Sequence, residues 1–152
     1  CDYELLQKLK SDFDLVKNDR LKKYEIHMGE FDIDIYTPFF SELGIPVEDL
    51  QKHIRVIDGF QVIEPEALLI LKQHAYMDRS GSAKGEKDKI DIFSLLKNAV
   101  DIKKYLTLVE KYQLSDYRDQ LVRLLKETRE ITEISLSAHT YAKLKKRLLD
   151  VL

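Results

Sequence analysis

Residues 24–36 alternate apolar and polar side chains on both sides of a Gly29-Glu30 dipeptide. Strict alternation of this kind is typical of a half-buried β-strand, and a two-residue loop that begins with glycine favours a type II′ turn. The segment is therefore predicted to form a β-hairpin, and the turn sets the register of its two strands. On the polar face, this register pairs His27 with Asp32 and Glu25 with Asp34.

The polar face of the hairpin gathers three carboxylates, because Glu25 joins Asp32 and Asp34 there. Like charges that lie directly opposite each other destabilise a sheet, so this face either lies in water or holds a cation. Asp32 and Asp34 are two residues apart on one strand and project to the same side. Mg²⁺ prefers one or two carboxylates together with substrate phosphates. A solvated sheet face and a metal site are therefore the two alternatives.

The composition is typical of a folded, globular chain. The 152 residues, 44% hydrophobic and 34% charged, suffice for one domain with a core, or for a small domain with a helical tail. A net charge of −2 argues against a protein that coats nucleic acid. A single cysteine, no signal peptide and no apolar run near ~18 residues predict a cytoplasmic protein with no membrane partner. The chain has only two Asn and many Lys, Glu and Leu, a composition typical of proteins from thermophiles.

The pattern as a whole predicts an α+β fold, with strands in the first part of the chain and helices in the rest. The apolar spacing over residues 3–17 predicts an amphipathic helix, and Asp58-Gly59 predicts a second hairpin within residues 55–62. Ser80 to Gly85 is expected to be a flexible loop. Further helices are expected at 47–53, 65–77, 86–98, 101–112, 115–130 and 138–151, with Ser115 and Ser137 as caps.

Two groups of cations on the predicted helices are candidates for binding an anion. Lys72 and Arg79 are seven residues apart near one helical face, where they could meet a phosphate. The alternative for Lys72 is a side chain whose stem covers apolar surface. Lys87 lies with two other lysines beside a glycine-containing loop at a helix start, next to Asp88 and Asp91 on one helical ridge. The alternative for this second group is an ordinary charged surface helix.

Three segments, taken in order, resemble the nucleotidyltransferase-fold superfamily, and in particular its small prokaryotic and archaeal members, which include toxin-type enzymes of abortive-infection systems. Residues 31–38, Phe-Asp-Ile-Asp-Ile-Tyr-Thr-Pro, resemble the strand that bears the third catalytic carboxylate. Residues 64–72 resemble the family's P-E-x-L-x-x-x-K helix start. Arg79 and residues 87–92 resemble its R…KD-x-x-D-I segment. The similarity covers residues 3–98.

The resemblance implies a role for each matching residue. Asp34 would be the carboxylate that activates the acceptor hydroxyl, with Asp32 as the alternate, and these two acids would also be the metal ligands. Lys72 would contact the nucleotide phosphates. The remaining members of the nucleotide-binding set would be Arg79, Lys87, Asp88 and Asp91. The implied reaction is Mg²⁺-dependent transfer of a nucleotidyl group from an NTP to an unknown acceptor: a nucleic acid such as RNA, a protein or a small molecule.

The same resemblance divides the chain into three parts: a partial nucleotidyltransferase-like core with a mixed sheet and flanking helices over 1–62, a helical part of the nucleotide cleft over 63–100, and a C-terminal helical region over 101–152. The family's first motif, a Gly-[Gly/Ser] turn and a D-x-D strand, would precede residue 1. We therefore expect either a fragment of a longer chain or a catalytically inactive binding module. Leu144, Leu148 and Val151 are expected to form either a partner or homodimer face, or a core face.

Overall fold

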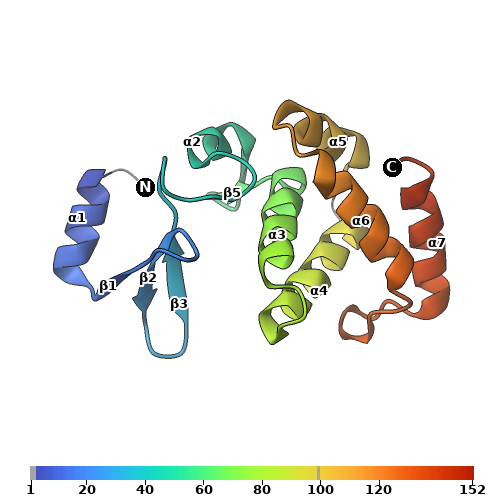
Figure 1. The fold of residues 1–152 in the computed structure, drawn as a ribbon, viewed down its shortest axis with the longest axis horizontal. Coiled ribbons are helices and arrows are strands. Elements are labelled where there is room, and N and C mark those ends of the chain that lie inside the picture. The colour runs from blue at the N-terminus through green and yellow to red at the C-terminus, as the bar shows by residue number, and fades with distance from the viewer. Residues whose placement is uncertain (1–2, 99) are drawn as a thin grey trace. The chain divides into compact units, whose positions relative to one another are not determined.

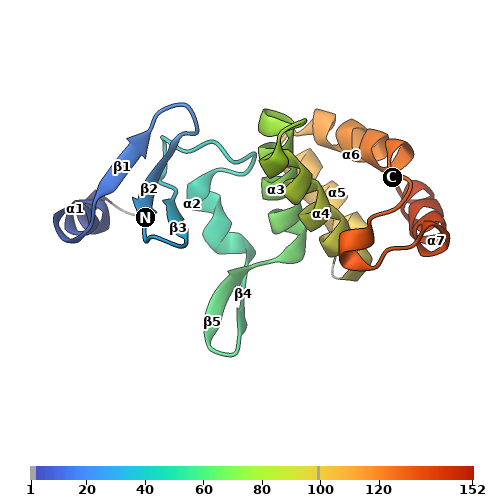
Figure 2. The same cartoon turned by 90° about the horizontal axis from the view of Figure 1, so that it is seen from below.

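The computed structural model describes residues 3–98 and 100–152 and confirms an α+β architecture (Figures 1 and 2). The chain divides into two compact units, Cys1–Lys52 and His53–Leu152. The first carries a three-stranded sheet and the second carries a two-stranded hairpin and the longer helices. Within the described ranges, no helix is both long and apolar enough to cross a membrane.

The first unit is built around an antiparallel sheet with the strand order β1-β2-β3. Its elements are α1 (Tyr3–Asp12), β1 (Leu15–Asn18), β2 (Lys23–His27), β3 (Asp32–Ile35) and α2 (Val47–Leu50), followed by the 3-10 turn η1 (Gln51–His53). The predicted register of the central hairpin is confirmed, with Glu25 opposite Asp34 and His27 opposite Asp32. Gly29 takes a φ of 83°, the left-handed conformation that the first loop position of a type II′ turn requires.

The helix predicted over residues 3–17 was too long. It ends at Asp12, and Leu15–Asn18 instead forms β1, which pairs with β2 so that Leu15 lies opposite Ile26. Helical spacing of apolar residues continued through Val16, but a β-branched valine favours a strand. Pairing with β1 gives β2 a hydrogen-bonded strand on each edge. This stabilisation comes from residues distant in the chain, so the local spacing of apolar residues could not predict it.

The second unit begins with the predicted hairpin, β4 (Ile54–Ile57) and β5 (Phe60–Ile63). Asp58 and Gly59 both have positive φ, 50° and 84°, as a type I′ turn requires. The helices follow as α3 (Pro65–Arg79), α4 (Ala83–Asn98), α5 (Ile102–Lys111), α6 (Ser115–Glu127), the short η2 (Thr132–Ile134) and α7 (Ala138–Leu149). Each helix predicted in this unit is present, and its ends agree with the prediction or differ from it by up to three residues.

Glycine 85 lies inside α4, whereas the sequence pattern placed it in a loop before the helix. The helix begins at Ala83, and the Ser82 hydroxyl accepts a hydrogen bond from the Gly85 amide at 3.0 Å. A Cβ atom at position 85 would lie 2.3 Å from the carbonyl oxygen of Arg79, at the end of α3. Glycine is therefore required by the close approach of two helices, and not by chain flexibility.

The core of the second unit lies among its helices. The largest fully buried side chains include Leu69 and Ile70 from α3, Phe93 from α4, Tyr105 from α5 and Leu121 from α6. The last helix adds Leu144 and Leu148, which are also buried. These two leucines therefore form a core face, and of the three residues considered for a partner face only Val151 is exposed.

Of the two predicted helix caps, one is present and the other is not. The Ser137 hydroxyl accepts a hydrogen bond from the Thr140 amide and caps α7 as predicted. Ser115 does not cap α6: Leu114 precedes that helix without a side-chain cap, and the Ser115 hydroxyl donates to Asp116. An unpredicted cap begins α5, where the Asp101 carboxylate accepts from the amides of Lys103 and Lys104.

Candidate functional site

The acidic face of the hairpin is organised around a lysine. The Lys23 ammonium lies 2.7 Å from an oxygen of Glu25 and 2.7 Å from Oδ1 of Asp34. The Lys23 side chain is only 8% exposed, whereas Asp34 is 38% exposed. Lys23 therefore resolves the repulsion that the register imposes on Glu25 and Asp34, from a position on the same strand face two residues before Glu25.

The pKa directions agree with this arrangement. Burial lowers the pKa of the Lys23 ammonium, but hydrogen bonds to Asp34 and Glu25 outweigh burial, so that the pKa lies above its usual value. Hydrogen bonds from Lys23 and Asn18 hold the pKa of Glu25 below its usual value. Lys23 and Glu25 therefore remain charged together near neutral pH.

The Asp34 side chain is partly exposed, and its two oxygens have different partners. Lys23 holds Oδ1, while Oδ2 receives a hydrogen bond from the Tyr36 hydroxyl at a long 3.4 Å. Asp32 points to the same side of the strand but belongs to a separate pair, with its Oδ1 2.7 Å from Nδ1 of His27. The two predicted metal ligands thus lie on one face, and each is held by a different partner.

These acids do not by themselves form a site for two metal ions. Two-metal catalysis needs several converging carboxylates, whereas Asp34 and Asp32 engage Lys23 and His27. Among the residues that the structure describes, no group of three or more His, Cys, Asp or Glu side chains is placed to hold a metal ion. Asp34, whose side chain is partly exposed, could supply Oδ2 as one oxygen ligand to a Mg²⁺ ion that arrives with a nucleotide.

The predicted nucleotide-binding residues lie in the second unit, where α3 and α4 pack against each other (Figure 1). Two ion pairs link these helices. Lys72 contacts Asp91 at 2.6 Å, and Arg79 binds Asp88 through two hydrogen bonds of 2.6 and 2.8 Å. The fold thus joins four of the five residues, and the fifth, Lys87, lies exposed on α4.

The two ion pairs differ in their exposure and therefore in what they can do. The Asp88 side chain is 3% exposed, so its bidentate pair with Arg79 fixes the end of α3 against the first turns of α4. Lys72 and Asp91 are 33% and 48% exposed. The Arg79 side chain is as exposed as Lys72, at 32%, but the buried Asp88 holds it by two hydrogen bonds. A phosphate could therefore displace the exposed Asp91 from Lys72 more readily than it could displace Asp88 from Arg79.

The glutamate of the Pro65-Glu66 helix start has a structural role that the sequence did not reveal. Glu66 is buried, and its carboxylate accepts a hydrogen bond from the Asp101 amide at 2.9 Å. Lys104 lies 3.7 Å from the same carboxylate and 3.0 Å from that of Glu64. These contacts fasten the start of α3 to the start of α5, and they position the helix that carries Lys72.

Lys23 is the residue that sequence reasoning missed at this site. The signal was present, because the alternation that assigned Glu25 to the polar face extends back two residues to position 23. The outward-facing lysine of a strand is usually solvated, so only its burial identifies it as the partner of two carboxylates. Comparisons of the chain with protein-family models, with curated proteins and with solved structures found no match.

Proposed function

We propose that the chain takes part in nucleotidyl transfer from an NTP, bound as its Mg²⁺ complex, to an acceptor hydroxyl. Each unit is assigned its own role: Asp34, in the first unit, acts on the acceptor, and Lys72, in the second unit, binds the nucleotide phosphates. The order of the three segments that resemble the nucleotidyltransferase fold supports the assignment, and so does the hairpin register, which brings Asp34 to a partly exposed position on a defined strand.

The observation that carries this proposal is the state of the Asp34 carboxylate. A group that accepts a proton from an attacking hydroxyl must be ionised, oriented and reachable. Lys23 holds one oxygen of Asp34 at 2.7 Å and fixes its direction, the other oxygen has one long contact at 3.4 Å, and the side chain as a whole is 38% exposed. Asp32 pairs with the His27 ring at 2.7 Å, whereas Asp34 is oriented by the buried Lys23, so Asp34 is the acid assigned to the reaction.

Lys72 supports the second half of the proposal. Its ammonium is held at the surface of α3 by Asp91, and a phosphate could replace that carboxylate as its partner. Arg79 and Asp88 then act by holding α3 and α4 together, and not by touching the nucleotide. The acceptor class, and a toxin role of the kind found in abortive-infection systems, belong to the same proposal.

Nucleotide binding can be measured by titration calorimetry with each NTP in the presence of Mg²⁺. Lys72→Ala is expected to weaken binding about tenfold or more, because a charged hydrogen bond contributes about 1.5–3 kcal/mol. Lys89→Ala is the matched control, because Lys89 is a partly exposed lysine on α4 that pairs with Glu86 at 3.5 Å. If both substitutions weaken nucleotide binding equally, Lys72 contributes only a nonspecific positive charge.

A second function is favoured by one observation, namely that both proposed functional groups already have partners within the chain. Asp34 pairs with Lys23, and Lys72 pairs with Asp91. If these pairs are purely structural, the chain is a nucleotidyltransferase-like binding module without catalysis. The same calorimetric titration separates the two functions, since the module predicts no Mg²⁺-dependent heat with any NTP.

A further inference from the structure

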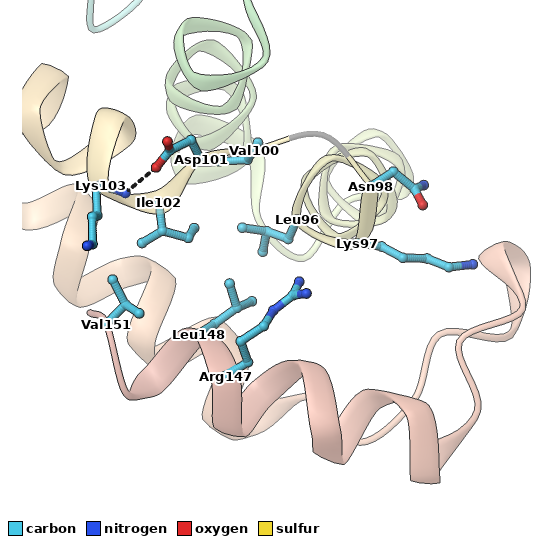
Figure 3. A pocket seen from close by; sticks show the side chains of 10 residues that line it. All are labelled: Leu96, Lys97, Asn98, Val100, Asp101, Ile102, Lys103, Arg147, Leu148 and Val151. Atoms are coloured by element: carbon cyan, nitrogen blue, oxygen red, sulfur yellow. Dashed lines mark hydrogen bonds between the residues drawn. The ribbon is translucent and has the colours of Figure 1, made fainter.

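A hollow of about 470 Å³ lies where the end of α4 and the start of α5 face the last turns of α7 (Figure 3). Its volume falls in the range of small-molecule sites, about 300–1,000 Å³. Five of its lining residues have aliphatic side chains: Leu96 from α4, Val100 before α5, Ile102 from α5, Leu148 from α7, and Val151. None of the residues assigned to nucleotidyl transfer lines it.

Arg147 supplies a positive charge to this apolar hollow. Its guanidinium extends from α7 toward the space near Leu96, as Figure 3 shows. No hydrogen bond or ion pair joins Arg147 to another of the described residues. A second, smaller hollow of about 240 Å³ also includes Arg147 and extends along α7 past Leu144. The guanidinium therefore stands between two hollows, with its donors available.

The other charged groups at the hollow are engaged or peripheral. The Lys97 ammonium points away in Figure 3 and donates to the carbonyl oxygen of Ile134 at 2.9 Å. The Asp101 carboxylate accepts from the amides of Lys103 and Lys104 at 2.9 and 3.2 Å, so it serves the start of α5. Asp101 therefore does not neutralise the guanidinium that enters the hollow.

We propose that this hollow binds a small monocarboxylate with an aliphatic body. A guanidinium matches a carboxylate in planar, bidentate geometry, and the aliphatic walls match a hydrocarbon chain. A nucleotide polyphosphate is disfavoured because it needs several converging cations. Lys97 is bonded elsewhere, and the Lys103 side chain lies on the other side of Ile102 from Arg147 (Figure 3). The site is separate from the residues of the proposed nucleotidyl transfer and does not depend on that function.

The test is a titration of the full chain followed by methyl resonances in NMR, with octanoate, acetate and octanamide as the three probes. Octanoate carries both a carboxylate and a hydrocarbon chain. Acetate carries the carboxylate without the long chain, and octanamide carries the chain without the charge. Octanoate is expected to shift the methyl signals of Leu96, Ile102 and Val151 saturably. Acetate and octanamide are expected to bind at least about tenfold more weakly.

Substitutions then assign the charge. Arg147→Gln is expected to weaken octanoate binding at least about tenfold. Arg123→Gln is the matched control, since Arg123 is an exposed arginine on α6 outside the hollow, and it should leave the affinity unchanged. Val151 is exposed, and Val151→Glu places a carboxylate near the carboxylate of bound octanoate. The repulsion between them should weaken octanoate binding independently of Arg147.

The proposal is overturned if octanoate produces no saturable shift, if acetate binds as well as octanoate, or if Arg147→Gln keeps the affinity of the parent chain. If Arg147→Gln fails to fold, as judged by circular dichroism, Val151→Glu decides. An unchanged octanoate affinity in a folded Val151→Glu chain then contradicts the site, and a lowered affinity supports it.

Discussion

Lys23 determines whether the acidic hairpin can fold as it does. It is buried, and it contacts two carboxylates that the strand register places opposite each other. Lys23→Met should keep the hydrocarbon stem and remove the charge, which leaves Glu25 and Asp34 to repel each other. We expect the free energy of unfolding to fall by about 1–3 kcal/mol, measured by urea denaturation.

The control for this substitution is Lys52→Met, because Lys52 belongs to the same unit and pairs with Asp49 while 64% of its side chain is exposed. An exposed pair contributes about 0–1 kcal/mol, so the control should change little. Equal losses from both substitutions would mean that Lys23 acts as an ordinary surface lysine.

His27 gives the hairpin a dependence on pH. A hydrogen bond to Asp32 raises the pKa of His27 above the ordinary 6.5. Because the folded pKa exceeds the unfolded one, the stabilisation is complete below about pH 6.5 and is lost as pH rises through the folded pKa. An NMR titration of the His27 ring should show the raised pKa, and Asp32→Asn should return it toward 6.5; an unchanged pKa in that variant would exclude the pair as its cause.

At the scale of elements, the α3–α4 connection depends on Gly85. A methyl group there would lie 2.3 Å from the Arg79 carbonyl oxygen. Gly85→Ala should therefore destabilise the fold by about 1–3 kcal/mol through overpacking, although alanine in a helix is otherwise favoured by about 1 kcal/mol. The comparison is Lys84→Ala, an exposed neighbour, with an expected change within about 0.5 kcal/mol. A more stable Gly85→Ala chain in the same denaturation experiment would contradict this close approach.

The hairpins could be predicted from the sequence because their glycine-containing turns and alternation act locally and fix the register. Strand β1 could not, because Leu15–Asn18 becomes a strand through its pairing with β2, while its spacing also fits a helix. The role of Gly85 was hidden for a related reason, since the atom that excludes a side chain belongs to α3. Local rules succeed where the deciding contact is local.

At the scale of the whole molecule, the candidate site also has a part that the sequence could predict and a part that it could not. The sequence placed Asp32 and Asp34 on one strand face, but it could not show that Lys23 and His27 bind them separately. The sequence also named Lys72 and Asp91, which are 19 residues apart in the chain and become partners only when α3 packs on α4. The ion pairs of the candidate site therefore form within each compact unit. In the proposed function, Asp34 and Lys72 act from these pairs.

The most direct test of the proposed function follows the α-phosphate label of an NTP into product, with the full chain, Mg²⁺ and candidate RNA or protein acceptors. Asp34→Asn should abolish transfer while circular dichroism shows an intact fold. Asp32→Asn, two residues away on the same strand face, should retain most of it. Undiminished transfer by Asp34→Asn, or equal loss from both substitutions, would contradict the assignment of Asp34 to the reaction.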